Sequence, residues 1–260
     1  QLSVGGRASM LLNLPRDYYL HGYLLKDPRL NLSYIMGKAF KNTFRVGYGE
    51  ESKTPTLDYL YPEKLYKDFY MLNAYTIDPR YRHLITYTNI YDVANRDLHV
   101  NKNRKMEAGW DIDYRGFSLS LTAFYEQSDA GFEYFTTYHP LTYDLYSQLK
   151  PGANIEGRTP QKSDYIQEKY SIFTTSQQVK NSQKVTKRGI EYRLILPKLK
   201  PLLTTIEING AYYQTDYASS LPLYYYPDVK IGGKEYPYVC IYDNGARNQY
   251  RRFNSNVWLN

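Results

Sequence analysis

The sequence has almost no cysteine and no long apolar segment, and each absence excludes a class of protein. Cys240 is the only cysteine among 260 residues, so the chain has no internal disulfide and no cysteine-based metal site. We interpret Cys240 as a small apolar residue. The mean hydropathy is -0.63, and no apolar run approaches the roughly 18 residues of a membrane-spanning helix. An α-helical membrane protein is therefore excluded.

The usual motifs of catalysis and nucleotide binding are also missing. His21, His83, His99 and His139 occur in predicted loops, without histidine partners two or four residues away. The segment Gly232-Gly233-Lys234 lacks the spacing of a phosphate-binding loop. The net charge of +7 would allow nucleic-acid binding, but Lys and Arg are scattered rather than gathered in one stripe. We therefore expect no enzymatic activity, no cofactor, no metal site and no nucleic-acid partner.

Tyrosine, in contrast, is abundant. It occurs 32 times, and its ring with a polar tip suits two settings. One is an aromatic girdle at a lipid boundary. The other is a surface that binds sugars or bases.

The clearest pattern in the chain runs from Arg104 to Glu126. Charged or small residues alternate with apolar ones from Lys105 to Tyr114, and the alternation restarts at Phe117 after Arg115-Gly116. This predicts a β-hairpin with a two-residue connection, in which only Phe124 breaks the polar face. Each arm has about 10 residues, which at about 3.3 Å per residue and a tilt near 45° spans the apolar band of an outer membrane.

Similar alternation predicts eight strands. Their expected ranges are 2–13, 29–36, 43–49, 105–114, 117–126, 185–196, 205–213 and 248–260. The connections alternate between long and short: the segments 16–28, 50–103, 128–184 and 217–247 are long, whereas 37–41, 115–116 and 197–201 are short. Two more strands are expected inside the second long segment, near 67–76 and 82–91. Sorting by length is typical of outer-membrane barrels, which have short periplasmic turns and long extracellular loops.

The sequence thus predicts an all-β fold, an antiparallel up-and-down transmembrane β-barrel. About eight of its strands lie in residues 1–260, which we expect to be part of one barrel domain. The chain begins in mid-pattern without a visible signal peptide, so we expect a signal peptide to have been removed or the chain to begin inside a longer protein.

An ordered series of motifs resembles the barrel region of TonB-dependent outer-membrane receptors. It begins with Asp27-Pro28-Arg29-Leu30-Asn31 and Phe44-Arg45-Val46-Gly47-Tyr48-Gly49, and continues with Lys53-Thr54-Pro55-Thr56-Leu57 and Leu60-Tyr61-Pro62. The segments Lys105-Met106-Glu107-Ala108-Gly109-Trp110-Asp111 and Arg188-Gly189-Ile190-Glu191 follow in the family's order. The tyrosine-rich long segments look most like the members from Bacteroidetes.

The resemblance implies a barrel of about 22 strands around a plug, of which this chain would be the middle-to-late third. It also implies location in the bacterial outer membrane and energy-coupled uptake of a scarce ligand such as a siderophore, cobalamin or a glycan. The implied partners are outer-membrane lipid, the TonB complex, the ligand and a surface lipoprotein that acts as a lid. The plug, the TonB-contacting box and a terminal aromatic strand are not found in these residues.

Two groups of residues are candidates for ligand binding. The lumen-facing candidates are Arg7, Arg45, Glu107, Asp111, Asp113, Glu126, Glu191, Arg193 and Glu207. The loop aromatic candidates are Tyr18, Tyr19, Tyr138, Tyr143, Tyr224, Tyr225 and Tyr226. The tyrosines suit stacking on a flat ligand or binding of a lid protein, but also girdle and loop packing.

Two alternatives stay open for the acidic candidates and for the whole chain. Glu107, Asp111 and Asp113 share a strand face, which fits a glycosidase pair or a cation site as well as an ionic lumen lining. For the whole chain, the alternatives are a passive porin-type barrel and a soluble β-sandwich that binds or cleaves glycans.

Overall fold

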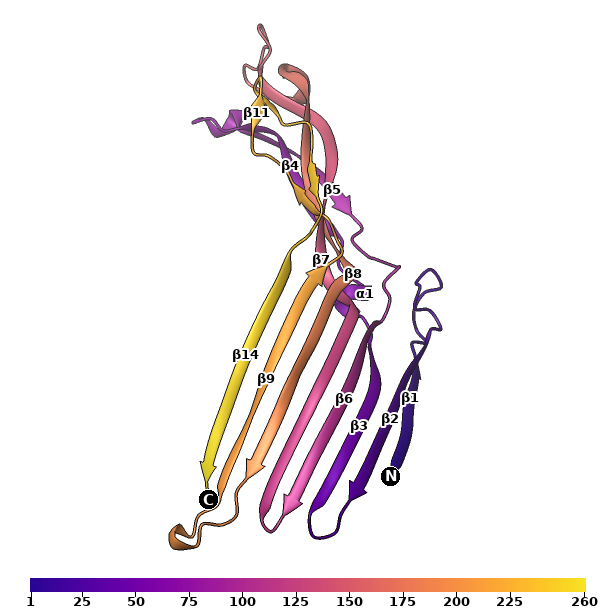
Figure 1. The fold of residues 1–260 in the computed structure, drawn as a ribbon. Coiled ribbons are helices and arrows are strands. Elements are labelled where there is room, and N and C mark those ends of the chain that lie inside the picture. The colour runs from indigo at the N-terminus through magenta and orange to yellow at the C-terminus, as the bar shows by residue number, and fades with distance from the viewer.

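The protein is all-β and is dominated by one large antiparallel sheet. The structure is a computed structural model that describes every residue from 1 to 260. Eight strands form the sheet in the order β1-β2-β3-β6-β7-β8-β9-β14 (Figure 1). Their bounds are β1 (Leu2–Met10), β2 (Leu24–Met36), β3 (Lys41–Lys53), β6 (Asn101–Tyr114), β7 (Phe117–Leu149), β8 (Tyr165–Ile195), β9 (Ile206–Ser219) and β14 (Arg247–Leu259). None of the helices has the length and apolar character needed to cross a membrane.

Each strand of this sheet pairs with the next sheet strand along the chain, so the topology is an up-and-down meander. Strands β1 and β14 form the two edges and do not pair with each other, so the sheet is open. The eight strands expected from the sequence are confirmed. The structure does not show a closed barrel.

The short connections lie together at one end of the sheet (Figure 1). The Arg115-Gly116 turn is confirmed, and its two residues have φ values of 46° and 83°, as a type I′ turn requires. The turn between β2 and β3 contains Gly37 with φ 87°. The third connection is longer than predicted, because the 3-10 helix η3 (Lys200–Leu202) and a bridge between Leu199 and Thr204 enlarge it.

The long connections lie at the opposite end, where the second, third and fourth form a head of small elements and the first lies beside the ends of β1 and β2 (Figure 1). The second connection contains α1 (Leu57–Leu60), β4 (Leu65–Ala74), η1 (Pro79–Tyr81) and β5 (His83–Tyr91). Strands β4 and β5 pair as a hairpin, so both expected strands of this segment are confirmed. The last connection contains β10 (Leu223–Tyr225), β11 (Lys230–Ile231), β12 (Lys234–Glu235) and β13 (Cys240–Tyr242), and pairs β10 with β13 and β11 with β12.

The prediction of a long loop over 128–184 was wrong. Strands β7 and β8 continue past the level of their neighbours as one paired ladder, which reaches Leu149 and Tyr165, and only η2 (Lys162–Asp164) and its flanks form the tip. The ladder shifts register between Ser128 and Gly131. Beyond that point, polar residues such as Thr174 and Ser176 are buried to the same extent as the apolar Phe135. Apolar and polar residues therefore no longer sort by face, and the alternation that identifies a strand is lost.

Two other boundaries were also wrong. Strand β1 ends at Met10 rather than at residue 13, because Leu14 turns into a small core. The loop expected over 16–28 ends early, since β2 begins at Leu24 and includes Pro28, which lies opposite Gly6.

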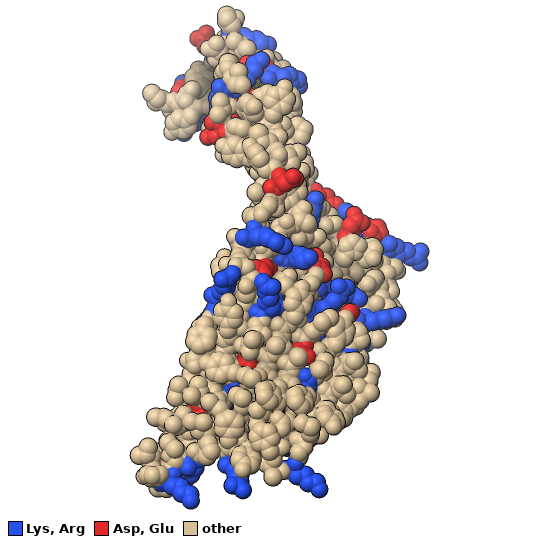
Figure 2. Space-filling view, viewed as in Figure 1, with Lys and Arg blue, Asp and Glu red and all other residues tan.

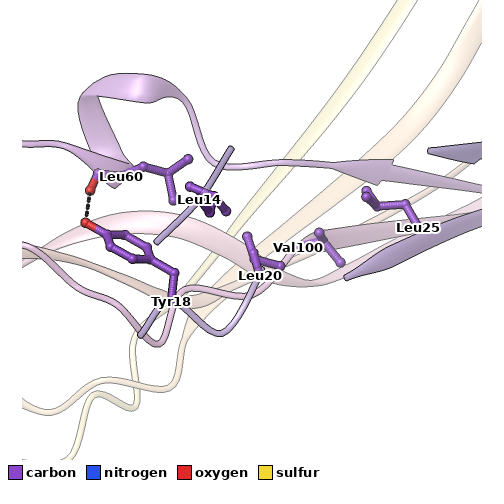
Figure 3. Close-up of a cluster of buried hydrophobic side chains, with 6 residues drawn as sticks. All are labelled: Leu14, Tyr18, Leu20, Leu25, Leu60 and Val100. Atoms are coloured by element: carbon purple, nitrogen blue, oxygen red, sulfur yellow. Dashed lines mark hydrogen bonds between the residues drawn. The ribbon is translucent and has the colours of Figure 1, made fainter. Parts of the chain in front are cut away.

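Small hydrophobic cores hold the long connections in place. In the first, shown in Figure 3, the Tyr18 hydroxyl donates a hydrogen bond of 2.7 Å to the carbonyl oxygen of Leu60. The members of this core are Leu14, Tyr18, Leu20, Leu25, Leu60 and Val100. A second core joins the β4–β5 hairpin to the β7–β8 extension through Met71, Leu72, Ile85, Tyr146 and Tyr165. The head is thus fixed by packing, whereas the large sheet lacks a comparable core.

Candidate functional site on the polar face of the sheet

One face of the large sheet is apolar, and we call it the apolar face. The pairing register places one row of directly opposite residues across all eight strands. The row consists of Leu2, Leu32, Val46, Ala108, Ala123, Ile190, Tyr212 and Phe253. Trp110 lies opposite Phe44 in the neighbouring row of the same face, and their rings stack with centroids 6.3 Å apart. These side chains remain accessible: Ile190 is 52% exposed and Trp110 39%.

The opposite face, which we call the polar face, carries most of the candidate residues. Its corresponding row contains Ser3, Asn31, Gly47, Glu107, Phe124, Gly189, Tyr213 and Arg252. No second sheet packs on either face, and the strands of the sheet contact mainly their neighbours. The large sheet is therefore a single layer that presents one apolar surface and one ionic surface.

Arg45 and Asp111 form the centre of the polar face. Arg45 donates from Nε and Nη2 to the two carboxylate oxygens of Asp111, at 2.7 and 2.8 Å. The same Nη2 lies 3.3 Å from the Thr122 hydroxyl, and the Ser120 hydroxyl donates to Asp111 at 2.6 Å. This network ties together β3, β6 and β7. A bidentate pair of this kind fixes both side chains.

Gly109 makes this network possible. It lies opposite Arg45 in the ladder, and a Cβ atom added there would stand 2.9 Å from Nη2 of Arg45. The glycine therefore leaves room for the guanidinium group to lie flat on the sheet.

Phe124, the one apolar residue predicted on the polar face of the β6–β7 hairpin, has a related role. Its ring covers Gly189 on β8, where an added Cβ would come within 3.0 Å of the ring carbon Cε1. The Lys105 ammonium lies 5.8 Å from the centre of the same ring. An aromatic side chain that covers a strand glycine restores the packing that the missing side chain would supply.

The other candidates lie in separate ion pairs rather than in one cluster. Arg7 binds Asp27 at 2.9 Å near the β1 edge, and Asp27 is 2% exposed and also accepts from the backbone N–H of Ser52. Arg193 binds Glu207 at 2.7 Å. Two further pairs are Glu107 with Lys105 and Glu126 with Lys187, whereas Glu191 and Asp113 form no ion pair.

The acidic candidates do not form a metal site. No group of three His, Cys, Asp or Glu side chains comes together in a way that could hold a metal ion. Asp111, Glu107 and Glu126 each have a cationic partner instead. The arrangement provides paired charges and hydrogen-bonding groups along one face of the sheet.

Open depressions follow the polar face and include residues that the sequence analysis missed. The first lies between Asn31, Arg45, Glu107 and Thr122. Another, near the head, is lined by Asn103, Glu126, Gln183 and Lys187 among others. A third contains Glu191, Arg193, Asn209, Asn254 and Asn256. The asparagines share the alternating positions of the charged candidates, which is the signal that could have found them.

The tyrosine candidates are not one exposed loop surface. Tyr18 belongs to the first core and is buried, which favours loop packing, one of the two roles expected for these tyrosines. Tyr138 and Tyr143 lie within β7 rather than in a loop. Tyr19 packs its ring on His99, at 3.9 Å between ring centroids. Tyr225 is exposed.

Aromatic contacts join the head. Tyr143 stacks on Tyr87 of β5, with centroids 6.3 Å apart and ring planes 9° apart. Tyr138 packs against Tyr224 and Tyr226, at 6.5 and 6.0 Å. The β7–β8 extension is thereby joined to the small hairpins of two different connections. These contacts show that Tyr138, Tyr143, Tyr224 and Tyr226 pack within the head.

Two polar contacts in the head perturb ionisable groups. Tyr170 donates to Glu235 at 2.9 Å, and burial together with this hydrogen bond raises the pKa of Tyr170 to about 12. At the tip of the extension, Arg158 binds Asp164 at 2.6 Å and lowers the pKa of that carboxyl group to about 2.

Comparison of the chain with known protein families, with curated proteins and with solved structures gave no match in any of the three.

Proposed function

We propose that this chain is part of the barrel of an outer-membrane TonB-dependent transporter, which takes up a scarce ligand by an energy-coupled mechanism. In this proposal the apolar face contacts lipid and the polar face lines the lumen. The protein has no catalytic role. A siderophore, cobalamin or a glycan is the expected class of ligand.

The observation that carries the proposal is the accessible apolar face. A row of apolar side chains crosses eight strands without interruption, and nothing in the protein covers it. Apolar surface exposed to water costs about 25 cal/mol per Å², and contiguous patches of this extent mark an interaction surface. Hydrocarbon on that face removes the cost. The ionic opposite face then needs water, as the lumen of a barrel provides.

The arrangement of the connections supports the same proposal. The three short turns lie at one end of the sheet and the head lies at the other (Figure 1). Outer-membrane barrels have this asymmetry between their periplasmic and extracellular rims. The head would then be extracellular, where its hairpins are available to a ligand or to a lid lipoprotein.

The two open edges also fit part of a larger barrel. The backbone groups of β1 and β14 on their outer sides have no strand partner in the sheet. Unpaired backbone groups cannot remain in hydrocarbon, so additional strands of the complete protein would have to pair there.

The motif series favours a TonB-dependent transporter over a passive porin. Lys53-Thr54-Pro55-Thr56-Leu57 connects the end of β3 to α1, and Leu60 of that helix lies in the first core. This segment therefore has a structural role in attaching the first and second long connections.

A soluble β-sandwich is disfavoured because the sheet has no second layer.

Membrane extraction and the full reading frame together test the proposal. We expect the full-length protein to remain with outer membranes after an alkaline carbonate wash and to dissolve only in detergent. We also expect the complete reading frame to encode a plug domain. A complete protein that is monomeric in water without detergent would overturn the membrane assignment, and a membrane protein without a plug would overturn active transport.

A further inference from the structure

The three short turns carry exposed cations that form no ion pair. Lys38 lies in the β2–β3 turn and Lys41 at its end, Arg115 in the β6–β7 turn, and Lys198 and Lys200 in the β8–β9 connection. We call these five residues the turn cations. On the face seen in Figure 2, Lys and Arg lie at this end of the sheet without Asp or Glu among them.

The turn cations differ from the paired cations at the centre of the polar face. Arg45, Lys187 and Arg193 each bind a carboxylate, whereas none of the turn cations takes part in an ion pair. The segments 37–40, 115–116 and 196–205 contain no Asp or Glu. Asp113 lies opposite Lys41 in the ladder and lines the same depression as Lys38 and Arg115, without an ion pair to any of them. The five cations outnumber this one carboxylate, so this end of the protein has an excess of positive charge.

Exposed apolar side chains lie among these cations. Leu202 and Leu203 follow Lys200 directly and are 70% and 72% exposed. Phe40, between Lys38 and Lys41, is also exposed and packs on Tyr114 with centroids 5.7 Å apart. The apolar residues continue into the apolar face, because Ile206 lies opposite Leu259 at this end of β9 and β14.

We infer that the turn cations bind the anionic headgroups of phospholipids in the bilayer leaflet at the short-turn end. Phe40, Leu202 and Leu203 would enter the acyl region just below the phosphates. This inference rests on the proposed function, because it requires the apolar face to be in a membrane. Lysine and arginine near a bilayer surface attract anionic lipids, and apolar side chains beside them anchor in the interface.

Lipid explains these turns better than an acidic protein does. An acidic protein would neutralise the cations but would leave no reason for leucines beside them at the end of the apolar face. A phospholipid satisfies both, since its phosphate and its acyl chains lie at adjacent depths.

Lipid selectivity in bilayers tests the inference. The full-length protein would be reconstituted in phosphatidylcholine vesicles that contain a spin-labelled lipid, either phosphatidylglycerol or phosphatidylcholine, and the protein-bound fraction of each would be measured. For the unmodified protein we expect about a threefold preference for the anionic lipid at low salt, which decreases as salt is added. In the turn variant this preference should fall to about one. The turn variant combines Lys38→Gln, Lys41→Gln, Arg115→Gln, Lys198→Gln and Lys200→Gln.

A head variant with the same change in net charge provides the control. It replaces five exposed cations of the long connections that also form no ion pair, and it should keep the preference. These substitutions are Arg16→Gln, Lys64→Gln, Lys150→Gln, Lys162→Gln and Lys234→Gln.

The possible results separate the inference from the proposed function. A protein that inserts in vesicles but shows no anionic preference, or shows the same preference in both variants, overturns the inference and leaves the proposed function standing. Retention of an acidic polypeptide by the turns, without selectivity among lipids, also overturns the inference. A protein that fails to insert overturns both.

Discussion

The guanidinium group of Arg45 reaches both carboxylate oxygens of Asp111 by crossing over Gly109. Three strands are thereby connected on the polar face by one pair of charges and two hydroxyl groups. The pair is partly accessible to solvent, so its net contribution to stability is modest, about 1 kcal/mol or less. Its main effect is to hold the two charges at fixed positions on the face.

Replacement of Gly109 should disturb this arrangement. In Gly109→Ala, the new Cβ would meet the Arg45 guanidinium at 2.9 to 3.2 Å and displace it, at a cost of about 1 kcal/mol in the free energy of unfolding. Refolding into detergent micelles with a denaturant titration measures this cost. Gly5→Ala is the control, because a Cβ at Gly5 would meet nothing within 4 Å. Equal effects of the two substitutions would contradict the role assigned to Gly109.

Adjacent residues of β6 should respond differently to polar substitutions. Trp110→Arg places a charge on the apolar face and should cost about 2 to 4 kcal/mol if position 110 lies near the bilayer midplane. Asp111→Asn keeps an acceptor for Arg45 on the polar face and should cost about 1 kcal/mol or less. Refolding into lipid vesicles compares the two, and small, similar effects would count against the assigned faces.

Gly189 should be less tolerant than Gly109. A Cβ at Gly189 would collide with the carbonyl oxygen of Tyr212 and with the Phe124 ring, and backbone cannot move aside as a flexible guanidinium can. Gly189→Ala should therefore cost about 1 to 3 kcal/mol, measured by the same denaturant titration. If the loss were no larger than for Gly109→Ala, the close approach of β8 to β9 would be disproved.

The Tyr170–Glu235 contact predicts an alkaline titration in the head. Because the pKa of Tyr170 is raised to about 12, the folded head holds this proton more tightly than an unfolded chain, whose tyrosines titrate near 10. The resulting stabilisation is present below about pH 10 and decreases as the pH rises through about 12. The difference in phenolate absorbance between the unmodified protein and Tyr170→Phe should have its midpoint near 12.

Removal of the carboxylate provides the control for this titration. In Glu235→Gln the midpoint of the Tyr170 titration should fall, because the hydrogen bond to a charged acceptor is lost. If the midpoint were the same with and without the Glu235 carboxylate, the hydrogen bond would not be a cause of the shift.

The sequence predicted the part of the fold that is governed by two-faced strands. Strand pairs such as β6 and β7 have one apolar and one polar face, so the period of two identifies them directly. The two strands β4 and β5 were also expected, although their pairing was not. The β7–β8 extension was missed, because residues such as Phe135 and Thr174 are buried regardless of type when hairpins pack beside them.

The candidate site was predicted in part for a similar reason. Arg45 and Asp111 have charges that make their face obvious, and the structure brings them together. The residues that contact them across strands, such as Gly109 beside Arg45 and Lys187 beside Glu126, depend on the register between strands. Alternation within one strand does not determine that register. The burial of Tyr18 was not evident from its residue type, because a tyrosine whose hydroxyl donates to a backbone carbonyl oxygen can be buried like an apolar residue.

Nitroxide labels on adjacent residues of β8 test most directly whether the apolar face contacts lipid. With Cys240→Ser as background, Ile190→Cys and Glu191→Cys would each carry a label in the reconstituted full-length protein, and Val257→Cys and Asn256→Cys would repeat the comparison on β14. The labels at 190 and 257 should relax with oxygen, which is concentrated in hydrocarbon, and those at 191 and 256 with a water-soluble nickel complex. Labels that all relax equally with the nickel complex would show that both faces are in water, and would contradict the proposed function.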